Sequence, residues 1–160
     1  MALEFLPMGQ KDAERIAEWE YEEPYSFYNA KSDEEDLELL LNPKARKDVY
    51  YSVYDQGELI GFYTFERNDP YVEIGLGLKP ERTGNGFGKQ FLQAGLQYAK
   101  SQFHQDAFAL SVAAFNKRAI KVYEKAGFKQ VKTFMQKTNG SEYEFVRMTY
   151  EDSFSYYSNN

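Results

Sequence analysis

The sequence predicts an α+β fold in which a mixed, mostly antiparallel sheet carries several helices. Three observations support this class. Segments rich in Val, Ile, Tyr and Phe follow one another across short turns, which is typical of antiparallel hairpins. One such segment instead runs through a glycine-rich loop into an amphipathic helix before the next strand, which is typical of a parallel crossover. Near the end of the chain, two further such segments flank Asn139-Gly140, which predicts another hairpin.

Seven segments have the length and composition of strands. The pairs Gln56-Gly57 and Asn139-Gly140 are typical of tight hairpin turns, and Asn68-Asp69-Pro70 predicts a turn between the third and fourth strands. In chain order, the expected strands are Leu3 to Leu6, Val49 to Tyr54, Leu59 to Glu66, Tyr71 to Leu78, Phe108 to Ala113, Phe128 to Lys137 and Glu142 to Tyr150.

Two helices are expected before the second strand. Residues Lys11 to Glu20 place apolar side chains at helical spacing. Ser32 followed by Glu35 three positions later is a capping-box pattern, and it predicts a helix that runs through Leu41 and ends before Pro43.

Two further helices flank the fifth predicted strand. Residues Phe87 to Ala99 carry an apolar stripe at helical spacing. Asn116 is a favourable N-cap residue for the next helix. Gly127 is expected to end that helix, because glycine adopts the left-handed conformation without a steric penalty.

Length and composition limit the function. The chain has 160 residues, and we expect a single domain over residues 1–152 followed by a polar tail at 153–160. Its net charge of −6 argues against a nucleic-acid partner. There is no apolar run long enough to span a bilayer, so no membrane partner is expected. The lack of cysteine suits a reducing compartment, and we expect a cytoplasmic protein.

The most informative stretch is the glycine-dense loop over residues 82–88, which joins a predicted strand to a predicted helix. Such a loop directs unpaired backbone N–H groups and the positive end of a helix dipole at one point, which suits a phosphate or pyrophosphate. A P-loop is excluded because Gln90, after Gly88 and Lys89, replaces its Ser or Thr. A dinucleotide fingerprint fails too, since its third glycine falls on Lys89 or Phe91.

Instead, the loop resembles the acyl-CoA pyrophosphate loop of the GNAT N-acetyltransferase family, Q/R-x-x-G-x-G/A. Thr83 takes the Q/R place, and Gly86-Phe87-Gly88 supplies the G-x-G part. The segment from Asn116 to Phe128 is similar to the family's N-x-x-A-x-x-x-Y-x-x-x-G-F motif. The two motifs stand in the family's order, with room between them for one helix and one strand.

The resemblance implies the family's seven-strand sheet, with helices on both faces. It also implies that strands four and five splay apart and hold the pantetheine arm of acetyl-CoA, the co-substrate. The loop amides would bind the pyrophosphate, and Asn116 would contact the arm besides capping its helix. The cofactor-binding residues expected on this basis are Leu76, Leu78, Thr83, Gly84, Asn85, Gly86, Phe87, Gly88, Lys89 and Asn116.

Two residues are candidates for catalysis. Tyr123 matches the tyrosine of the family motif and would protonate the departing thiolate as a general acid; the alternative is a core tyrosine. Glu73 lies on the fourth strand near the place of the family's catalytic base, but one residue out of register, which turns a strand side chain to the other face. Water leading to Glu22 or Glu23 is another route for the proton.

An aromatic segment is the candidate acceptor site. It lies where the family places its acceptor, and its aromatic faces and carboxylates would suit an ammonium group through cation–π and ionic contacts. Aromatic packing under a loop is an equal alternative. The predicted acceptor-binding residues are Trp19, Glu22, Glu23, Tyr25 and Tyr28, with Phe27 beside them.

The sequence therefore predicts an acetyl-CoA-dependent N-acetyltransferase in which an amine attacks the thioester directly. The alternative is a non-catalytic module that binds or senses acyl-CoA. The amine, the length of the acyl group and the oligomeric state are left open. With His104 as the single histidine and no cysteine, we expect no metal site and no Ser-His-Asp hydrolase.

Overall fold

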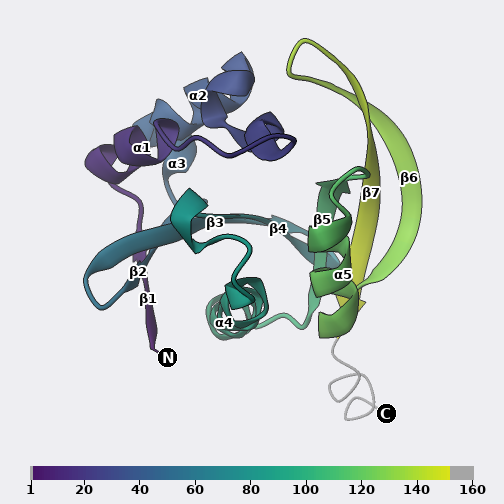
Figure 1. Cartoon of the computed structure of the whole chain (residues 1–160). Helices are drawn as coiled ribbons and strands as arrows, with labels where there is room; N and C mark the ends of the chain where they lie inside the picture. The colour runs from purple at the N-terminus through teal and green to yellow at the C-terminus, as the bar shows by residue number, and fades with distance from the viewer. Residues whose placement is uncertain (1, 152–160) are drawn as a thin grey trace.

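The computed structural model describes residues 2–151 and contains a seven-stranded sheet of order β1-β2-β3-β4-β5-β7-β6 (Figure 1). Neighbouring strands are antiparallel except β4 and β5, which are parallel. The predicted mixed, mostly antiparallel sheet is thus confirmed. The predicted tail at 153–160 lies outside the described residues. The strands are β1 (Leu3–Pro7), β2 (Tyr50–Asp55), β3 (Glu58–Asn68), β4 (Tyr71–Leu78), β5 (Ala107–Ala113), β6 (Lys129–Thr138) and β7 (Ser141–Glu151).

Helices cover both faces of the sheet. In Figure 1, α4 and α5 lie on one side of the strands, and α1 to α3 lie on the other with the 3-10 turns η1 and η2. The helices are α1 (Gln10–Ala17), α2 (Glu34–Leu41), α3 (Pro43–Arg46), α4 (Phe87–Phe103) and α5 (Lys117–Ala126), and the 3-10 turns are η1 (Tyr25–Tyr28), η2 (Ala30–Ser32) and η3 (Pro80–Arg82).

The helix boundaries near the N-terminus correct two predictions. The cap of α2 is Asp33, whose carboxylate accepts a hydrogen bond from the Asp36 N–H at 3.0 Å. Ser32 was the wrong choice because it belongs to η2 and its hydroxyl donates to the Ser26 carbonyl oxygen at 2.9 Å. Helix α1 also ends at Ala17, earlier than expected, and the short helix α3 was not predicted.

The predicted turns are present. Gln56 and Gly57 both have positive φ, at 50° and 82°, and so do Asn139 and Gly140, at 51° and 77°. Positive φ at both central residues is the signature of the hairpin turn that matches strand twist. These turns set the registers of β2 with β3 and of β6 with β7.

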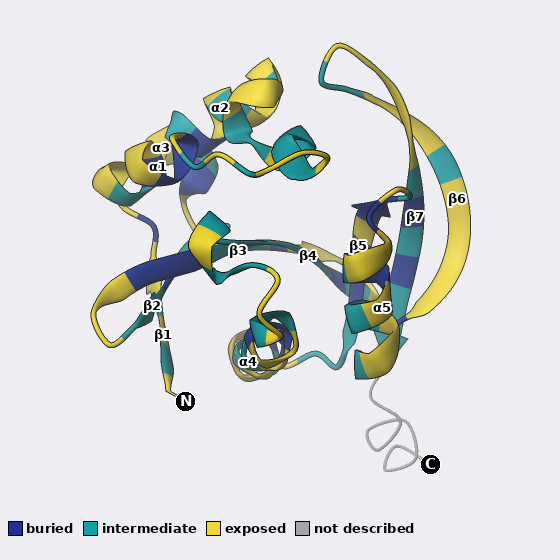
Figure 2. Ribbon diagram, viewed as in Figure 1, coloured by how far each residue is buried: buried dark blue, intermediate teal, exposed yellow. Residues whose placement is uncertain are grey.

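The main core lies between the sheet and helices α4 and α5, where buried residues of β3, β4, β5 and β7 meet both helices (Figure 2). Gly95 allows α4 to lie close to the sheet, since a Cβ there would be 2.1 Å from Cζ of Tyr63. The buried Tyr63 hydroxyl donates to the Phe91 carbonyl oxygen at 2.8 Å. This packing holds α4 against β3.

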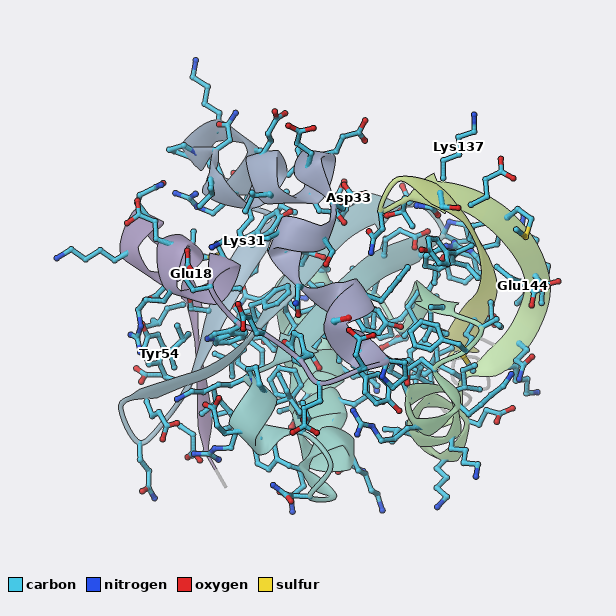
Figure 3. All side chains as sticks on the ribbon, turned by 45° about the horizontal axis from the view of Figure 1, so that its top comes forward. Glu18, Lys31, Asp33, Tyr54, Lys137 and Glu144 are labelled. Carbon is cyan, nitrogen blue, oxygen red and sulfur yellow. The ribbon has the colours of Figure 1, made fainter. Side chains whose placement is uncertain are left out.

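A second apolar cluster attaches α1 and α2 to the opposite face of the sheet. Polar contacts reinforce it. The Lys31 ammonium lies 2.8 Å from the Glu18 carboxylate (Figure 3). The Tyr54 hydroxyl donates to Asp12 at 2.5 Å. None of the helices within the described residues is long and apolar enough to span a membrane.

The tip of the β6–β7 hairpin is anchored to the start of α2. The Asp33 carboxylate accepts hydrogen bonds from the Asn139 N–H at 2.9 Å and from the Thr138 hydroxyl at 2.8 Å. The hairpin tip, 105 and 106 positions from Asp33 along the chain, is thereby held beside η1 and η2. This contact closes one side of the site described next.

Candidate active site

Strands β4 and β5 separate soon after they meet. Their parallel pairing consists of Val72 with Phe108 and Glu73 with Ala109. Beyond this point β4 continues to pair with β3 as far as Leu78, and β5 continues to pair with β7. The two strands therefore diverge, as expected for the splayed strands four and five.

The backbone of β4 directs polar groups into the space between the diverging strands β4 and β5. The Lys79 N–H donates to the Ile60 carbonyl oxygen of β3 at 2.7 Å. Because N–H and C=O groups alternate sides along a strand, those of Leu76 and Leu78 face away from β3, toward β5. The Leu78 carbonyl oxygen accepts a hydrogen bond from the Tyr21 hydroxyl at 2.6 Å, so a residue of the N-terminal segment reaches the end of β4.

The loop between β4 and α4 holds a set of open backbone amides. Gly84 and Gly86 have φ of 77° and 75°, and Gly86 is the N-cap of α4 with no side chain capping the helix. Among the residues described, no backbone or side-chain group accepts a hydrogen bond from the amides of residues 84–89. A Cβ at Gly86 or Gly88 would meet no atom within 4 Å, so the space there is open.

Neighbouring side chains hold the loop without filling it. The Thr83 hydroxyl donates to the Pro80 carbonyl oxygen at 2.7 Å, so this side chain fastens η3. Arg82 lies 3.3 Å from Asp55 and from Glu58, and its guanidinium lies over the Phe87 ring. The loop thus combines a fixed backbone, open amides and the positive end of α4, which together fit the diphosphate of acetyl-CoA.

Three predicted residues come together where α5 begins. Asn116 is buried; its side-chain oxygen accepts from the Ala119 N–H at 3.1 Å, which confirms the predicted N-cap. Its side-chain nitrogen donates to the Tyr28 hydroxyl at 3.1 Å. Tyr123 lies two turns along α5, and side chains of helices point toward the N-terminus, so its phenol extends toward the same place.

The environment of Tyr123 keeps its phenol protonated. Burial raises its pKa above the ordinary value, and the nearby Tyr28 phenol raises it further. A phenol in that state holds its proton throughout the neutral and moderately alkaline range. Tyr123 can therefore donate a proton but cannot serve as a base near neutral pH.

Glu73 lies on the face of β4 opposite the main core, because its neighbours Val72 and Ile74 are core residues. Its carboxylate pairs with the Arg147 guanidinium through two hydrogen bonds of 2.9 and 2.5 Å, and Asn68 donates a third at 3.1 Å.

Partial burial would raise the pKa of Glu73, but the hydrogen bonds and charge of Arg147 together with Asn68 lower it below the ordinary value. A carboxylate that binds protons weakly is a poor general base. The geometry therefore favours a structural ion pair for Glu73 over the predicted role in catalysis.

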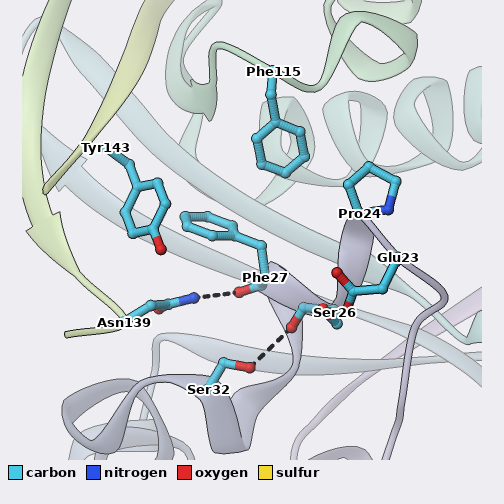
Figure 4. Close-up of a pocket in the computed structure, with 8 residues that line it drawn as sticks. All are labelled: Glu23, Pro24, Ser26, Phe27, Ser32, Phe115, Asn139 and Tyr143. Carbon is cyan, nitrogen blue, oxygen red and sulfur yellow. Dashed lines mark hydrogen bonds between the residues drawn. The ribbon is translucent and has the colours of Figure 1, made fainter. Parts of the chain in front are cut away.

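A cavity of about 420 Å³ opens beside the aromatic segment, between η1 and the β6–β7 hairpin (Figure 4). The Phe27 ring lies 4.9 Å from Tyr143 and 5.5 Å from Phe115, centroid to centroid. The Asn139 side chain donates to the Phe27 carbonyl oxygen at 2.8 Å and thereby fixes the hairpin against η1. The lining residues are Glu23, Pro24, Ser26, Phe27, Ser32, Phe115, Asn139 and Tyr143.

The predicted acceptor residues divide into two groups. Glu23 lines the cavity, and Tyr25 and Tyr28 lie on η1 beside it, each packed against Phe115. Trp19 instead packs in the second apolar cluster. Glu22 is exposed, and within the described part of the chain its side chain makes no hydrogen bond or ion pair.

Several residues near the site were missed by sequence reasoning. Phe115, Asn139 and Tyr143 reach the cavity through tertiary contacts only, and Tyr21 reaches Leu78 across 57 positions of sequence. The Asn139-Gly140 pair marks a turn, but no local motif marks any of these four residues as part of a site. Arg118 could have been noticed in the sequence, because it lies inside the motif of residues 116–128, two positions after Asn116.

The comparison with protein families identifies the class. The family described as the acetyltransferase (GNAT) family matches residues 13–128, which include the divergent strands, the glycine loop and α5. The protein belongs to the GNAT acetyltransferase family, whose members use acetyl-CoA.

Individual relatives agree with this assignment. A mycothiol acetyltransferase from Streptomyces coelicolor is 41% identical over 78 residues, which are 45% of this chain and 24% of that protein. The chain thus spans about a quarter of the length of that relative.

Solved structures of the same fold include a spermidine N-acetyltransferase from Vibrio cholerae in complex with CoA and spermine, with a TM-score of 0.74 and 24% identity over 94% of this chain and 96% of that one. A GNAT-family acetyltransferase from Bacillus anthracis has a TM-score of 0.73 and 18% identity over 94% of this chain and 95% of that one. Both likenesses concern the fold.

Proposed function

We propose that this protein is an acetyl-CoA-dependent N-acetyltransferase that moves an acetyl group to an amine by direct attack. The observation that carries the proposal is the divergence of β4 and β5 next to the open amides of residues 84–89. The gap would accept the pantetheine arm along Leu76 and Leu78, and the amides would bind the diphosphate.

The chemistry follows from the groups around the gap. When bound, acetyl-CoA supplies a thioester whose C–S bond breaks as the amine nitrogen bonds to the acetyl carbon. The phenol of Tyr123, whose pKa is raised further above neutral pH by desolvation, gives its proton to the departing sulfur. Tyr28 and Asn116 hold the side of the gap in place through their hydrogen bond. The proton lost by the amine leaves through water, because Glu73 is engaged by Arg147.

We further propose that the acceptor is a cationic amine that enters by the aromatic cavity. Glu23 supplies a carboxylate at its edge, and Phe27, Phe115 and Tyr143 supply aromatic faces, which attract ammonium groups. The net charge of −6 also favours cationic ligands. The Vibrio cholerae relative with spermine bound makes polyamines the first acceptors to test.

A thiol-release assay tests this function. The full chain is mixed with acetyl-CoA and a panel of polyamines, amino acids and peptides, and free CoA is detected with a thiol reagent. We expect turnover with a polyamine or another cationic amine. Binding of CoA by calorimetry without thiol release from any amine would instead favour the non-catalytic acyl-CoA-binding module.

A further inference from the structure

Arg118, the second residue of α5, lies between the glycine loop and the aromatic segment. Its guanidinium carbon is 4.2 Å from the centroid of the Tyr25 ring. One of its terminal nitrogens is 3.6 Å from the position that a Cβ on Gly84 would take. A single exposed side chain therefore touches η1 on one side and approaches the open amides on the other.

The charge of Arg118 has no counterpart in the described residues. Arg82 pairs with Asp55 and Glu58, and Arg147 pairs with Glu73. Within residues 2–151, by contrast, Arg118 makes no ion pair and donates no hydrogen bond. Stacking on an aromatic ring engages the face of a guanidinium and leaves its N–H edge available for an anion.

We infer that Arg118 binds the diphosphate at the glycine loop and, through its stack on Tyr25, couples that binding to the order of η1. The inference rests on the proposed function, because it takes the loop to hold the diphosphate of CoA. A stacked guanidinium is preorganised to donate two parallel hydrogen bonds to phosphate oxygens. Bound diphosphate would in turn fix the guanidinium and the Tyr25 ring beneath it.

The consequence extends to the acceptor side. The Tyr25 ring packs at 6.2 Å from Phe115, a residue that lines the aromatic cavity. Tyr25 thus contacts both regions, so binding at either one would change the affinity of the other by the same factor. CoA binding would therefore order the cavity before the amine arrives.

The first test measures the affinity of the full chain for CoA by calorimetry in wild type, Arg118→Gln and Arg118→Lys. We expect Arg118→Gln to weaken CoA binding roughly tenfold, since hydrogen bonds between charged groups are the strong ones. Arg118→Lys keeps the charge but loses the planar fork, so it should recover only part of the affinity. The control is Lys125→Gln, which removes an exposed charge near the end of α5 and should leave the affinity unchanged.

Fragments of CoA locate the contact. Dephospho-CoA keeps the diphosphate and lacks the 3′-phosphate, whereas pantetheine lacks both. Arg118→Gln should weaken CoA and dephospho-CoA by the same factor and leave pantetheine binding unchanged. An effect that disappears with dephospho-CoA would assign Arg118 to the 3′-phosphate and overturn the diphosphate contact.

The coupling is tested by hydrogen exchange. CoA should slow amide exchange over residues 25–28 in wild type and in Tyr25→Phe, which keeps the aromatic ring. It should not do so in Tyr25→Leu or Arg118→Gln. Equal protection in all four proteins would overturn the coupling.

These outcomes separate the inference from the function on which it rests. If wild type binds no CoA, the proposed function has failed. If wild type binds CoA and Arg118→Gln binds it equally well, only the role of Arg118 has failed.

Discussion

The glycine loop and the aromatic cavity are built in different ways. The loop over residues 84–89 offers backbone amides, and its shape depends on positive φ at two glycines and on the start of one helix. The cavity offers side chains that come from η1, from the segment before α5 and from the β6–β7 hairpin. The first is a local structure, and the second exists only when distant parts of the chain pack together.

This difference separates two kinds of recognition. Every residue except proline carries a backbone N–H group, so an amide-lined loop tolerates changes in most of its side chains but not in its backbone shape. A cavity made of side chains changes whenever one of them is replaced. We therefore expect co-substrate binding to depend on glycines and acceptor choice to depend on aromatic and acidic side chains.

The largest expected effect concerns Tyr123 on α5. Tyr123→Phe removes the proposed acid, and we expect kcat to fall roughly 100-fold with little change in the KM for acetyl-CoA. Because burial raises the pKa of Tyr123, the wild-type rate should show no loss from this group between neutral pH and pH of about 10. Steady-state kinetics across that range checks both statements, and unchanged turnover in Tyr123→Phe would remove it from the mechanism.

The second prediction challenges the glycine loop with a matched pair. Gly86 and Gly57 have φ of 75° and 82°, and a Cβ on either would meet no atom within 4 Å. Alanine at each position adopts an unfavourable left-handed conformation, which should cost about 1 kcal/mol of unfolding free energy. Only Gly86→Ala places a methyl group at the amides, so it alone should weaken CoA binding, by roughly tenfold or more.

Urea unfolding and calorimetry on both variants provide the check. Equal loss of CoA affinity in Gly57→Ala, which changes the β2–β3 turn, would show that backbone strain rather than the loop surface is responsible.

The third prediction concerns the cavity. Tyr143→Leu removes an aromatic face, and Glu23→Gln removes the carboxylate at the edge. Each should raise the KM for a cationic amine roughly tenfold, because contacts between cations and aromatic or acidic groups are lost, and leave the KM for acetyl-CoA unchanged. If Tyr143→Leu lowers only the stability, the aromatic cluster is packing rather than an acceptor site.

The smallest effect is expected at the contact that holds the hairpin beside the cavity. Asp33→Ala removes the cap of α2 and the acceptor for Asn139 and Thr138, which should cost about 1 kcal/mol of unfolding free energy. Glu38→Ala, at an exposed position within α2, is the control and should cost less.

This contribution depends on pH in a definite direction. Hydrogen bonds from the backbone of Asn139 and Asp36 and from Thr138 lower the pKa of Asp33 below its ordinary 3.8. The stabilisation is therefore present above that value and is lost as the pH falls through the lower pKa of the folded state. Urea unfolding at neutral pH and below pH 3.8 should show the difference between wild type and Asp33→Ala shrinking in acid.

The parts of the fold that are encoded locally could be predicted from the sequence. Pairs of residues with turn propensity, such as Asn139-Gly140, predicted the positions of the hairpins. The glycine loop and Asn116 predicted where α4 and α5 begin. The cap of α2 was misassigned to Ser32 because two adjacent residues could both serve, and only the surroundings of η2 decide between them.

The side chains of the site were less predictable, because their contacts join residues that are far apart in the sequence. Glu73 was proposed as a base from its position along the strand, but its partner Arg147 comes from β7, 74 positions away. Phe115 and Tyr143 join Phe27 only in the folded protein. Contacts of this kind leave no periodicity or motif in a single sequence.

The most direct test of the central claim follows the loop amides themselves. In a ¹⁵N-resolved NMR titration of the folded chain with CoA, the amide signals of Gly84, Gly86, Phe87 and Gly88 should shift most, and they should saturate at one CoA per chain. Shifts confined to other residues, or none at all, would contradict the account.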